Sequence, residues 1–286
     1  MPARGLAAFV AIAFSLASGA AGARSPARRI VSLNPSLTAI LLALGAGERL
    51  VGVDDRSARE DPRVAALPRV GGLFDPSLEA VVALEPDLVV AVPGAQQRDL
   101  VARIEGLRIE VVELPNITLD ELLGSIARLG ELVDRREAAR ARIAEIRAAF
   151  DRAERSSAGQ EAPRVVFALQ RDPLYVVGAG SFLDSMLRAA GARNAGAELG
   201  GPYPRAGLEW LIATAPDVIL DASEDAEDAA AYWSRWPSLP AVAKGRVVAL
   251  PPAEVTLPGP YPDRGLARVA AELHGSSGPP RVGERP

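Results

Sequence analysis

Short aliphatic runs alternate with amphipathic segments along most of the chain. Four such runs occur in the first 115 residues, and each is short enough for a buried strand: residues 30–33, 49–55, 88–92 and 108–115. Apolar residues at helical spacing occupy the stretches between them. Because strands that alternate with helices are typical of a parallel sheet covered by helices, this pattern predicts an α/β lobe.

Helix start and stop signals divide this lobe further. The Asn-Pro-Ser turn at residues 34–36 leads from the first strand into a helix over residues 37–44. Asp75 and Pro76 are residue types favoured at the N-cap and first helical positions, so they predict the start of the next helix. The Pro-Asp step at residues 86–87 ends that helix before the strand over 88–92.

The same plan returns later in the chain. "SLEAVVALEPDLVVA" at Ser77–Ala91 and "GLEWLIATAPDVILD" at Gly207–Asp221 share a Leu-Glu pair, a central Ala and a Pro-Asp step before an aliphatic run. Two further segments match the first lobe in the same order, a helix at residues 181–192 and a strand at 246–252, and the second lobe opens with a strand at 164–169. Three matching pairs in one order favour an internal duplication over chance similarity between α/β units.

A long helical stretch separates the two copies. Thr118 and Glu121 form a capping box, and Asp134 is a candidate N-cap for a second helix. About 20 helical residues span roughly 30 Å, and a helix is stiffer than a Gly/Ser-rich linker. The predicted fold class is therefore α/β, with two Rossmann-like lobes joined by a long rigid helix and a ligand cleft between them. The predicted parts are an N-terminal lobe over 24–133, a linking helix over 134–156 and a C-terminal lobe over 157–274.

The two ends of the chain carry other signals. The first residues show Arg4, an apolar run and a small-residue stretch ending at Ala23, which is the order of a secretory signal peptide over 1–23. Cleavage there predicts a periplasmic protein, and an uncleaved anchor is disfavoured because the apolar run is short for a bilayer. The Gly/Pro/Ser-rich tail over 275–286 is predicted to be disordered.

Composition excludes several functions. Hydrophobic residues make up 49% of the 286 residues and the net charge is −4, which favours a globular core and argues against a nucleic-acid partner. The chain has one His and no Cys, too few for a bound zinc or manganese ion, so no metal site and no cofactor are predicted. It contains no Gly-x-Ser-x-Gly motif or phosphate-binding loop, and no base is placed beside a nucleophile, so an enzyme is not predicted.

The segments at residues 29–54, 77–91 and 207–221, together with the helical stretch, resemble the periplasmic substrate-binding proteins that serve ABC importers of metal chelates and corrinoids. The resemblance is strongest to the cobalamin-binding members and covers about residues 29–274. It implies a class III fold and a monomer that captures cobalamin or a related corrinoid and delivers it to an ABC permease dimer with its ATPase subunits. Two alternatives stay open: a ferric siderophore or haem receptor, and a signalling or scaffold protein without transport.

The resemblance also assigns roles to residues. It implies that Glu79 and Glu209 dock onto arginines of the permease, although an acidic residue is also favourable in the first turn of a helix. Loops after the strands supply the ligand candidates. Aromatic rings clamp the corrin in the cobalamin-binding members, and Tyr175 and Tyr203 keep rings there, with Phe74 beside such a position, whereas Arg56, Leu73 and Val92 depart from the pattern. Arg56 and Arg171 suit an anionic group or are solvated loop charges. The predicted ligand-binding residues are Asn34, Arg56, Leu73, Phe74, Gln170, Tyr175, Tyr203 and Glu254.

Overall fold

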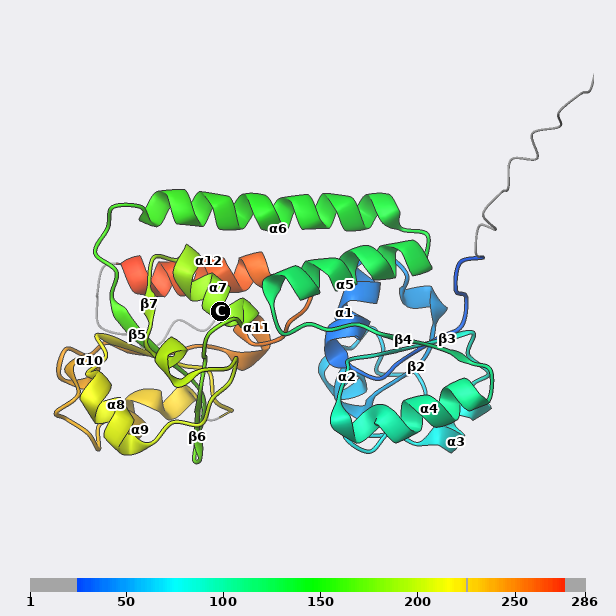
Figure 1. Ribbon diagram of the computed structural model, residues 1–286, viewed down its shortest axis with the longest axis horizontal. Helices are drawn as coiled ribbons and strands as arrows, with labels where there is room; N and C mark the ends of the chain where they lie inside the picture. The colour runs from blue at the N-terminus through cyan, green and yellow to red at the C-terminus, as the bar shows by residue number, and fades with distance from the viewer. Residues whose placement is uncertain (1–24, 225, 276–286) are drawn as a thin grey trace, which may run out of the picture.

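A computed structural model describes residues 25–224 and 226–275 and shows two α/β lobes side by side (Figure 1). The N-terminal sheet has the order β2-β1-β3-β4 and all its strands are parallel, as the alternation predicted. Its elements are β1 (Ile30–Ser32), α1 (Pro35–Ala43), η1 (Gly47–Arg49), β2 (Leu50–Val53), α2 (Asp55–Glu60), α3 (Leu78–Ala83), β3 (Leu88–Ala91), η2 (Ala95–Gln97), α4 (Arg98–Gly106) and β4 (Glu110–Glu113).

The C-terminal sheet repeats this order and adds a hairpin. Strands β7-β5-β8-β9 pair in parallel as β2-β1-β3-β4 do, while β6 pairs antiparallel with β5. Its strands are β5 (Arg164–Arg171), β6 (Leu174–Val176), β7 (Arg193–Asn194), β8 (Val218–Asp221) and β9 (Val247–Ala249). Its helices are α7 (Phe182–Ala189), η3 (Ala195–Leu199), α8 (Leu208–Thr214), η4 (Ala226–Asp228), α9 (Ala229–Trp233), α10 (Pro240–Ala243), α11 (Pro252–Val255) and α12 (Pro262–His274).

The repeated Pro-Asp step has the same structural role in both lobes. A residue with positive φ leads into it each time, Glu85 and Ala215, both at 46°. The Asp carboxylate then accepts a hydrogen bond from the backbone N–H at the start of the central strand. Asp87 does so ahead of β1 at 3.1 Å, and Asp217 does so at the start of β5 at 3.0 Å. The step therefore satisfies a strand end that has no partner in the sheet.

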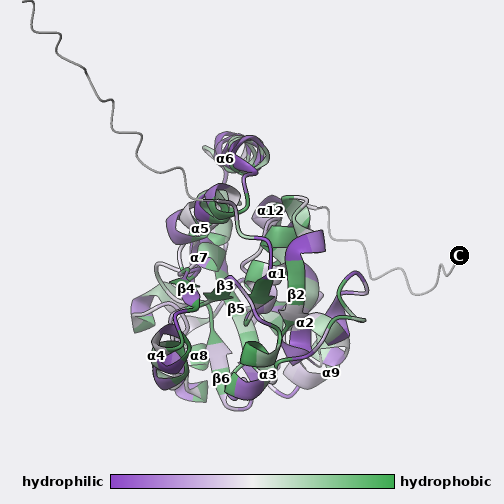
Figure 2. Cartoon of the chain, turned by 90° about the vertical axis from the view of Figure 1, so that its right-hand side faces the viewer, coloured by the Kyte–Doolittle hydropathy of each residue, from purple (hydrophilic) through white to green (hydrophobic). Residues whose placement is uncertain are grey.

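Two helices connect the lobes, α5 (Leu119–Leu132) and α6 (Arg136–Ser157). The 22 residues of α6 span about 33 Å and run over both lobes in Figure 1. Figure 2 shows α6 end-on above α5 and α12. One buried apolar cluster continues through both lobes and these helices. The lobes therefore share a hydrophobic core in addition to their covalent connection. Its members include Ile40, Leu129, Ile146, Phe150, Phe182 and Leu266.

One predicted helix start is confirmed, since the Thr118–Glu121 capping box is present. The first helix begins at residue 35, two residues before its predicted start, with Asn34 as its N-cap. Two other predicted starts are wrong. Asp75 and Pro76 do not begin α3, because residue 76 pairs with residue 71 in an antiparallel bridge and Ser77 then caps the helix. Asp134 does not cap α6: its φ of 51° places it in a left-handed turn, and the helix begins at residue 136.

The predicted signal peptide lies outside the described residues, and so does the predicted tail except for Gly275. Within residues 25–224 and 226–275, no helix combines the length and the hydropathy that a membrane span requires.

Candidate functional site between the lobes

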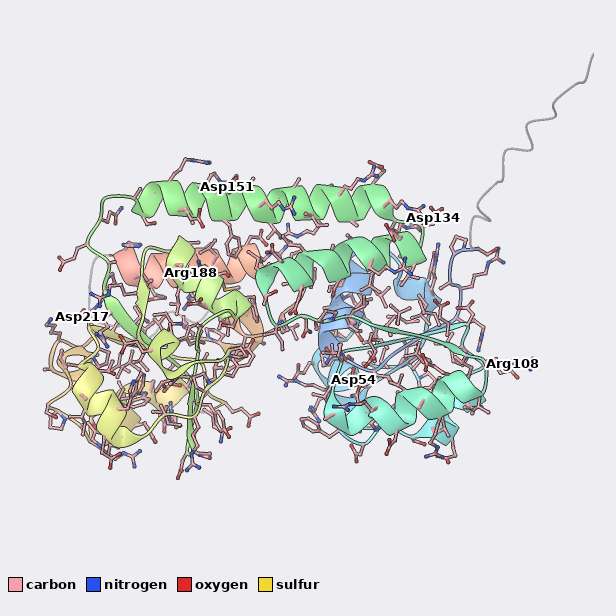
Figure 3. The ribbon with its side chains drawn as sticks, viewed as in Figure 1. Asp54, Arg108, Asp134, Asp151, Arg188 and Asp217 are labelled. Carbon is pink, nitrogen blue, oxygen red and sulfur yellow. The ribbon has the colours of Figure 1, made fainter. Side chains whose placement is uncertain are left out.

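The carboxyl ends of the strands face the space between the lobes. Asp54 follows β2, and Figure 3 shows it on the side of the N-terminal lobe nearer its neighbour. Asp217 precedes β8, and it lies at the outer end of the C-terminal lobe in the same view. Ligands of open α/β sheets bind beyond the carboxyl ends of the strands, so the candidate site lies between the lobes.

A cavity of about 370 Å³ lies where the lobes meet. Asn34, Arg56 and Leu73, three of the predicted ligand residues, line its N-terminal side. Asn116 also lines it, and sequence analysis missed this residue although it follows β4 as the other candidates follow their strands. The remaining lining comes from α1, α2 and the loop around α11: Pro35, Thr38, Ala39, Ser57, Glu60, Asp61, Ala253, Thr256, Leu257 and Pro258.

A smaller cavity of about 190 Å³ adjoins the first and shares Asn34 and Leu73 with it. Phe74 lines this cavity and is 72% exposed, an unusual exposure for a phenylalanine ring. The carbonyl oxygen of Leu73 accepts a 2.6 Å hydrogen bond from Gln97 Nε2, which ties the loop carrying Leu73 and Phe74 to η2. Gln97 also lines this cavity, together with Val92, Pro93 and Gly94.

A buried chain of polar groups supports the floor of the larger cavity. The Asp54 carboxylate is 1% exposed and accepts hydrogen bonds from the backbone N–H groups of Arg56, at 3.0 Å, and Ser57, at 2.9 Å, and from the Ser57 hydroxyl. Hydroxyl contacts continue from Ser57 to Thr38 at 3.0 Å and from Thr38 to Ser32 at 2.8 Å. These bonds satisfy the carboxylate and fix α2, which carries Arg56, beside α1.

Two predicted tyrosines lie on neighbouring extended segments of the C-terminal lobe. Tyr175 pairs with residue 205 across an antiparallel bridge, and the N–H of Val176 donates to the carbonyl of Pro204 at 3.1 Å. Tyr175 is 37% exposed and Tyr203 is 36% exposed, and neither lines the two cavities above. Burial, with a smaller contribution from the Glu121 carboxylate, raises the pKa of the Tyr203 hydroxyl to about 12.

The remaining two predicted ligand residues, Gln170 and Glu254, do not line either inter-lobe cavity. Gln170 is exposed, and its Nε2 donates to the carbonyl of Asp172 at 3.1 Å. Glu254 is exposed on α11 and does not line the larger cavity, although its neighbour Ala253 does. The structure therefore brings Asn34, Leu73, Arg56 and Phe74 together and leaves the C-terminal candidates apart from them.

Arg171 is neither a free anion contact nor a solvated loop charge, so both interpretations of it are wrong. Its side chain is 7% exposed; Nε lies 2.9 Å from Asp221 Oδ2, and Nη1 bonds to Asp228. Desolvation lowers the pKa of Arg171, but the hydrogen bonds to Asp228 and Asp221 outweigh it and raise the pKa overall. The sequence could not show this, since Asp221 is 50 residues away.

The two predicted docking glutamates occupy matching positions. Glu79 and Glu209 are both exposed, at the second residue of α3 and of α8. The Glu79 backbone N–H and the Ser77 hydroxyl hydrogen-bond to the Glu79 carboxylate and hold its pKa below the usual range. Glu209 instead follows Gly207, which provides no capping side chain, and the exposed apolar residues Leu208 and Ile212 flank it.

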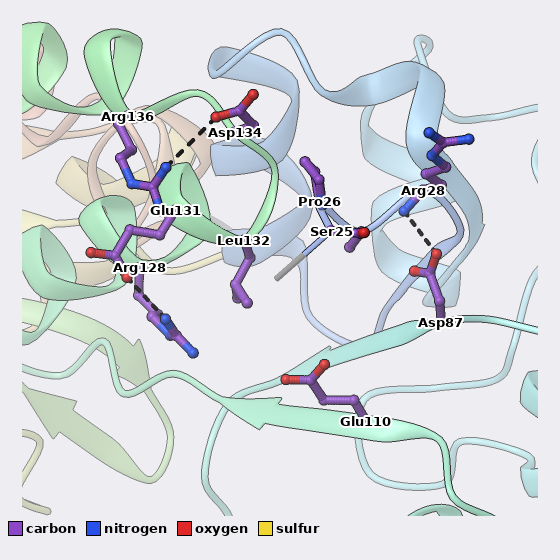
Figure 4. Close-up of a pocket in the computed structure, with 11 residues that line it drawn as sticks. Ser25, Pro26, Arg28, Asp87, Glu110, Arg128, Glu131, Leu132, Asp134 and Arg136 are labelled. Carbon is purple, nitrogen blue, oxygen red and sulfur yellow. Dashed lines mark hydrogen bonds and ion pairs between the residues drawn. The ribbon is translucent and has the colours of Figure 1, made fainter. Parts of the chain in front are cut away.

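A larger cavity of about 640 Å³ lies at the opposite, amino end of the N-terminal sheet (Figure 4). Several of its polar groups pair with one another. The backbone N–H of Arg28 donates to Asp87 at 2.9 Å, and Arg128 pairs with Glu131 at 2.9 Å. Because it opens where the strands begin, it is not the candidate ligand site.

Comparisons with known proteins agree with this architecture. The model of the periplasmic binding protein family matches residues 30–254, so the chain belongs to this family. A vitamin B12-binding protein of Vibrio campbellii is 26% identical over 234 residues, which are 82% of this chain and 84% of the relative.

Two solved structures share the fold closely. The periplasmic vitamin B12 binding protein BtuF of Vibrio cholerae superposes with a TM-score of 0.76 at 26% identity, covering 87% of this chain and 97% of that one. The apo form of the periplasmic heme-binding protein RhuT from Roseiflexus sp. RS-1 also gives a TM-score of 0.76 at 26% identity, covering 86% and 98%. The predicted family and class III fold are thereby confirmed, and the chain is a binding protein that works with components of an ABC transporter.

Proposed function

We propose that this protein binds cobalamin or a related corrinoid between its lobes and delivers it to an ABC permease dimer. The observation that carries the proposal is the set of three exposed rings, Phe74 at the smaller inter-lobe cavity and Tyr175 and Tyr203 on the C-terminal lobe, which suits a flat macrocycle. The printed names of the vitamin B12-binding relative and structural neighbour support the same ligand.

The alternative ligand, haem, fits the site less well. The 370 Å³ cavity between the lobes is lined by one guanidinium, Arg56, and by two carboxylates, Glu60 and Asp61. It therefore offers no surplus positive charge to the two propionates of haem. Tyrosine ligates haem iron as a phenolate, whereas burial of Tyr203 favours its neutral form. The peripheral carboxamides of a corrinoid are neutral, so a bound corrinoid needs neither cations for its side groups nor an ionised Tyr203.

Docking and location complete the proposal. Removal of residues 1–23 releases the mature chain into the periplasm, where it acts as a monomer without a cofactor and without catalysis. Glu79 and Glu209 meet matching basic residues of the two permease subunits, because a duplicated protein presents the same charge twice to a two-fold partner.

Retention of colour tests the ligand. The mature chain is incubated separately with cyanocobalamin and with haemin, desalted, and examined by visible absorption, followed by calorimetric titration for stoichiometry. We expect one corrinoid per chain and a retained red chromophore. A Soret band that survives desalting, without corrinoid retention, would move the assignment to haem.

A further inference from the structure

Asn116 lines the 370 Å³ cavity between the lobes and carries a hydrogen-bond acceptor whose orientation is fixed. The residue is 8% exposed and lines the cavity, and its Nδ2 lies 2.9 Å from the Ser36 hydroxyl. That hydroxyl donates its one proton to the carbonyl of Pro258, and a carbonyl can only accept. Ser36 Oγ must therefore accept from Asn116, which sets the orientation of the amide. Oδ1 points away from Ser36, and among the described residues no group donates to it.

Asn34 presents the complementary group. Its Oδ1 accepts a 2.9 Å hydrogen bond from the backbone N–H of Ser36, and a backbone N–H can only donate. The amide orientation of Asn34 is fixed in the same way, and its Nδ2 is the end of the amide that is left to donate to a ligand. Within residues 25–224 and 226–275, nothing accepts from this Nδ2, and Asn34 lines both cavities.

We propose that Asn34 and Asn116 form a subsite for a primary carboxamide. The ligand carbonyl accepts from Asn34 Nδ2, and the ligand N–H donates to Asn116 Oδ1, so both free amide ends gain partners. This inference rests on the proposed function, because carboxamides are the peripheral groups of a corrinoid. It adds a selectivity: a carboxylate at the same place would satisfy Asn34 but would turn a negative oxygen toward Asn116 Oδ1.

The charges nearby do not favour an acid at this subsite. Arg56, the cation that lines the cavity, lies 2.8 Å from Glu60, and Asp61 pairs with Arg63 at 2.6 Å. A ligand carboxylate would therefore have to compete with an existing ion pair. Ser36 is central to the arrangement, since it holds one asparagine through its N–H and the other through its hydroxyl.

Unmodified protein provides the first test. The mature chain is titrated calorimetrically with cyanocobalamin and with each derivative in which one peripheral carboxamide has been hydrolysed to a carboxylate. We expect one of these isomers to bind at least about tenfold more weakly than the others, since it leaves Asn116 Oδ1 unpaired and opposed to an oxygen. Equal affinities for all isomers would overturn the subsite. If no corrinoid binds at all, the proposed function fails, and the subsite fails with it.

Variants separate recognition from a general loss of structure. Asn116→Leu keeps a similar shape without the acceptor, and we expect it to reduce the tenfold discrimination to less than about threefold. Ser36→Ala keeps both asparagines but frees the Asn116 amide to turn, so it should also narrow the discrimination. Gln160→Leu, which removes an exposed amide at the end of α6, is the matched control and should change nothing. If Asn116→Leu weakens every ligand by one common factor, its role is structural and the proposal is rejected.

Discussion

The two lobes agree where their strands begin and differ where their strands end. At the amino ends, Asp87 and Asp217 cap the central strands in the same way after the same Pro-Asp step. At the carboxyl ends, the N-terminal lobe buries Asp54 among neutral hydroxyl and N–H groups, whereas the C-terminal lobe buries Asp221 against Arg171. The two lobes therefore share the contacts that start the sheet and differ where a ligand would bind.

The inserted β5–β6 hairpin is the largest of these differences. It carries Tyr175 and pairs with the segment that carries Tyr203, while the corresponding end of β1 turns directly into α1 through Asn34. The C-terminal lobe therefore offers two tyrosine rings, whereas the N-terminal lobe offers amides and hydroxyls together with the single ring of Phe74. A ligand with a flat face and a polar rim would use both.

The strongest test of this difference concerns the two buried aspartates. Asp221 is fully buried and also accepts a 2.6 Å hydrogen bond from Trp233 Nε1, so Asp221→Asn places a neutral amide against the buried guanidinium of Arg171 and leaves it Asp228 as its other carboxylate partner. We expect the free energy of unfolding to fall by about 2–4 kcal/mol, because a buried charge loses one of two partners. Asp54→Asn keeps an oxygen acceptor and disturbs no charged partner, and should cost about 1–2 kcal/mol.

Urea unfolding, followed by circular dichroism and by tryptophan fluorescence, measures both variants. All three tryptophans, at positions 210, 233 and 236, lie in the C-terminal lobe, so fluorescence follows that lobe while circular dichroism follows both. Because the lobes share one core, the two signals should coincide. Equal losses in the two variants, or separate transitions, would contradict this account.

Charge reversal compares the two docking helices. Glu79→Arg together with Glu209→Arg should weaken binding to the reconstituted permease by more than about tenfold, since each lobe then presents a like charge. The effect of Glu79→Arg alone should shrink in high salt. The effect of Glu209→Arg should shrink less in high salt. The exposed apolar residues Leu208 and Ile212 adjoin Glu209, and salt does not screen their contacts with the permease as it screens charges. Corrinoid affinity of each variant is the control and should not change; normal cyanocobalamin uptake by the double variant would remove the docking role.

Ring removal compares the ligand surfaces of the lobes. Tyr175→Ala and Phe74→Ala should each lower cyanocobalamin affinity about fivefold to tenfold, because each removes one aromatic contact with the macrocycle. Leu107→Ala, an exposed apolar residue just after α4, is the control and should leave the affinity unchanged. Calorimetric titration provides the affinities. A loss confined to one lobe's ring would show that the ligand lies against that lobe alone.

The smallest expected effect concerns the pH dependence of stability. The pKa of Tyr203 is about 12 in the folded protein and about 10 in an unfolded chain. Between these values the folded state holds one more proton, so stability is unaffected below about pH 10 and falls as the pH rises toward 12. Tyr203→Phe should lose less stability over this window when melting temperatures are recorded from pH 9 to 11.5. Identical profiles for the two proteins would place Tyr203 in water.

Local pattern was sufficient for much of the architecture. Aliphatic runs, the capping box at Thr118 and the repeated Pro-Asp step depend on neighbouring residues, so the sequence alone determined two α/β lobes, their order and the long helix. It also placed Glu79 and Glu209 at matching helix starts. The start of α3 was missed because a backbone bridge holds residue 76 outside the helix, so Ser77 caps the helix in place of Asp75.

Tertiary structure alone decided what the side chains do. Arg171 looked available until the fold placed Asp221 against it, and Asn116 looked like an ordinary connecting residue until the fold placed Ser36 beside it. The orientation of the Asn116 amide depends on a serine 80 residues away, whose own proton is taken by a carbonyl 222 residues further along. Hydrogen-bond donors and acceptors are assigned by contacts in space, and no local pattern records which distant segments meet.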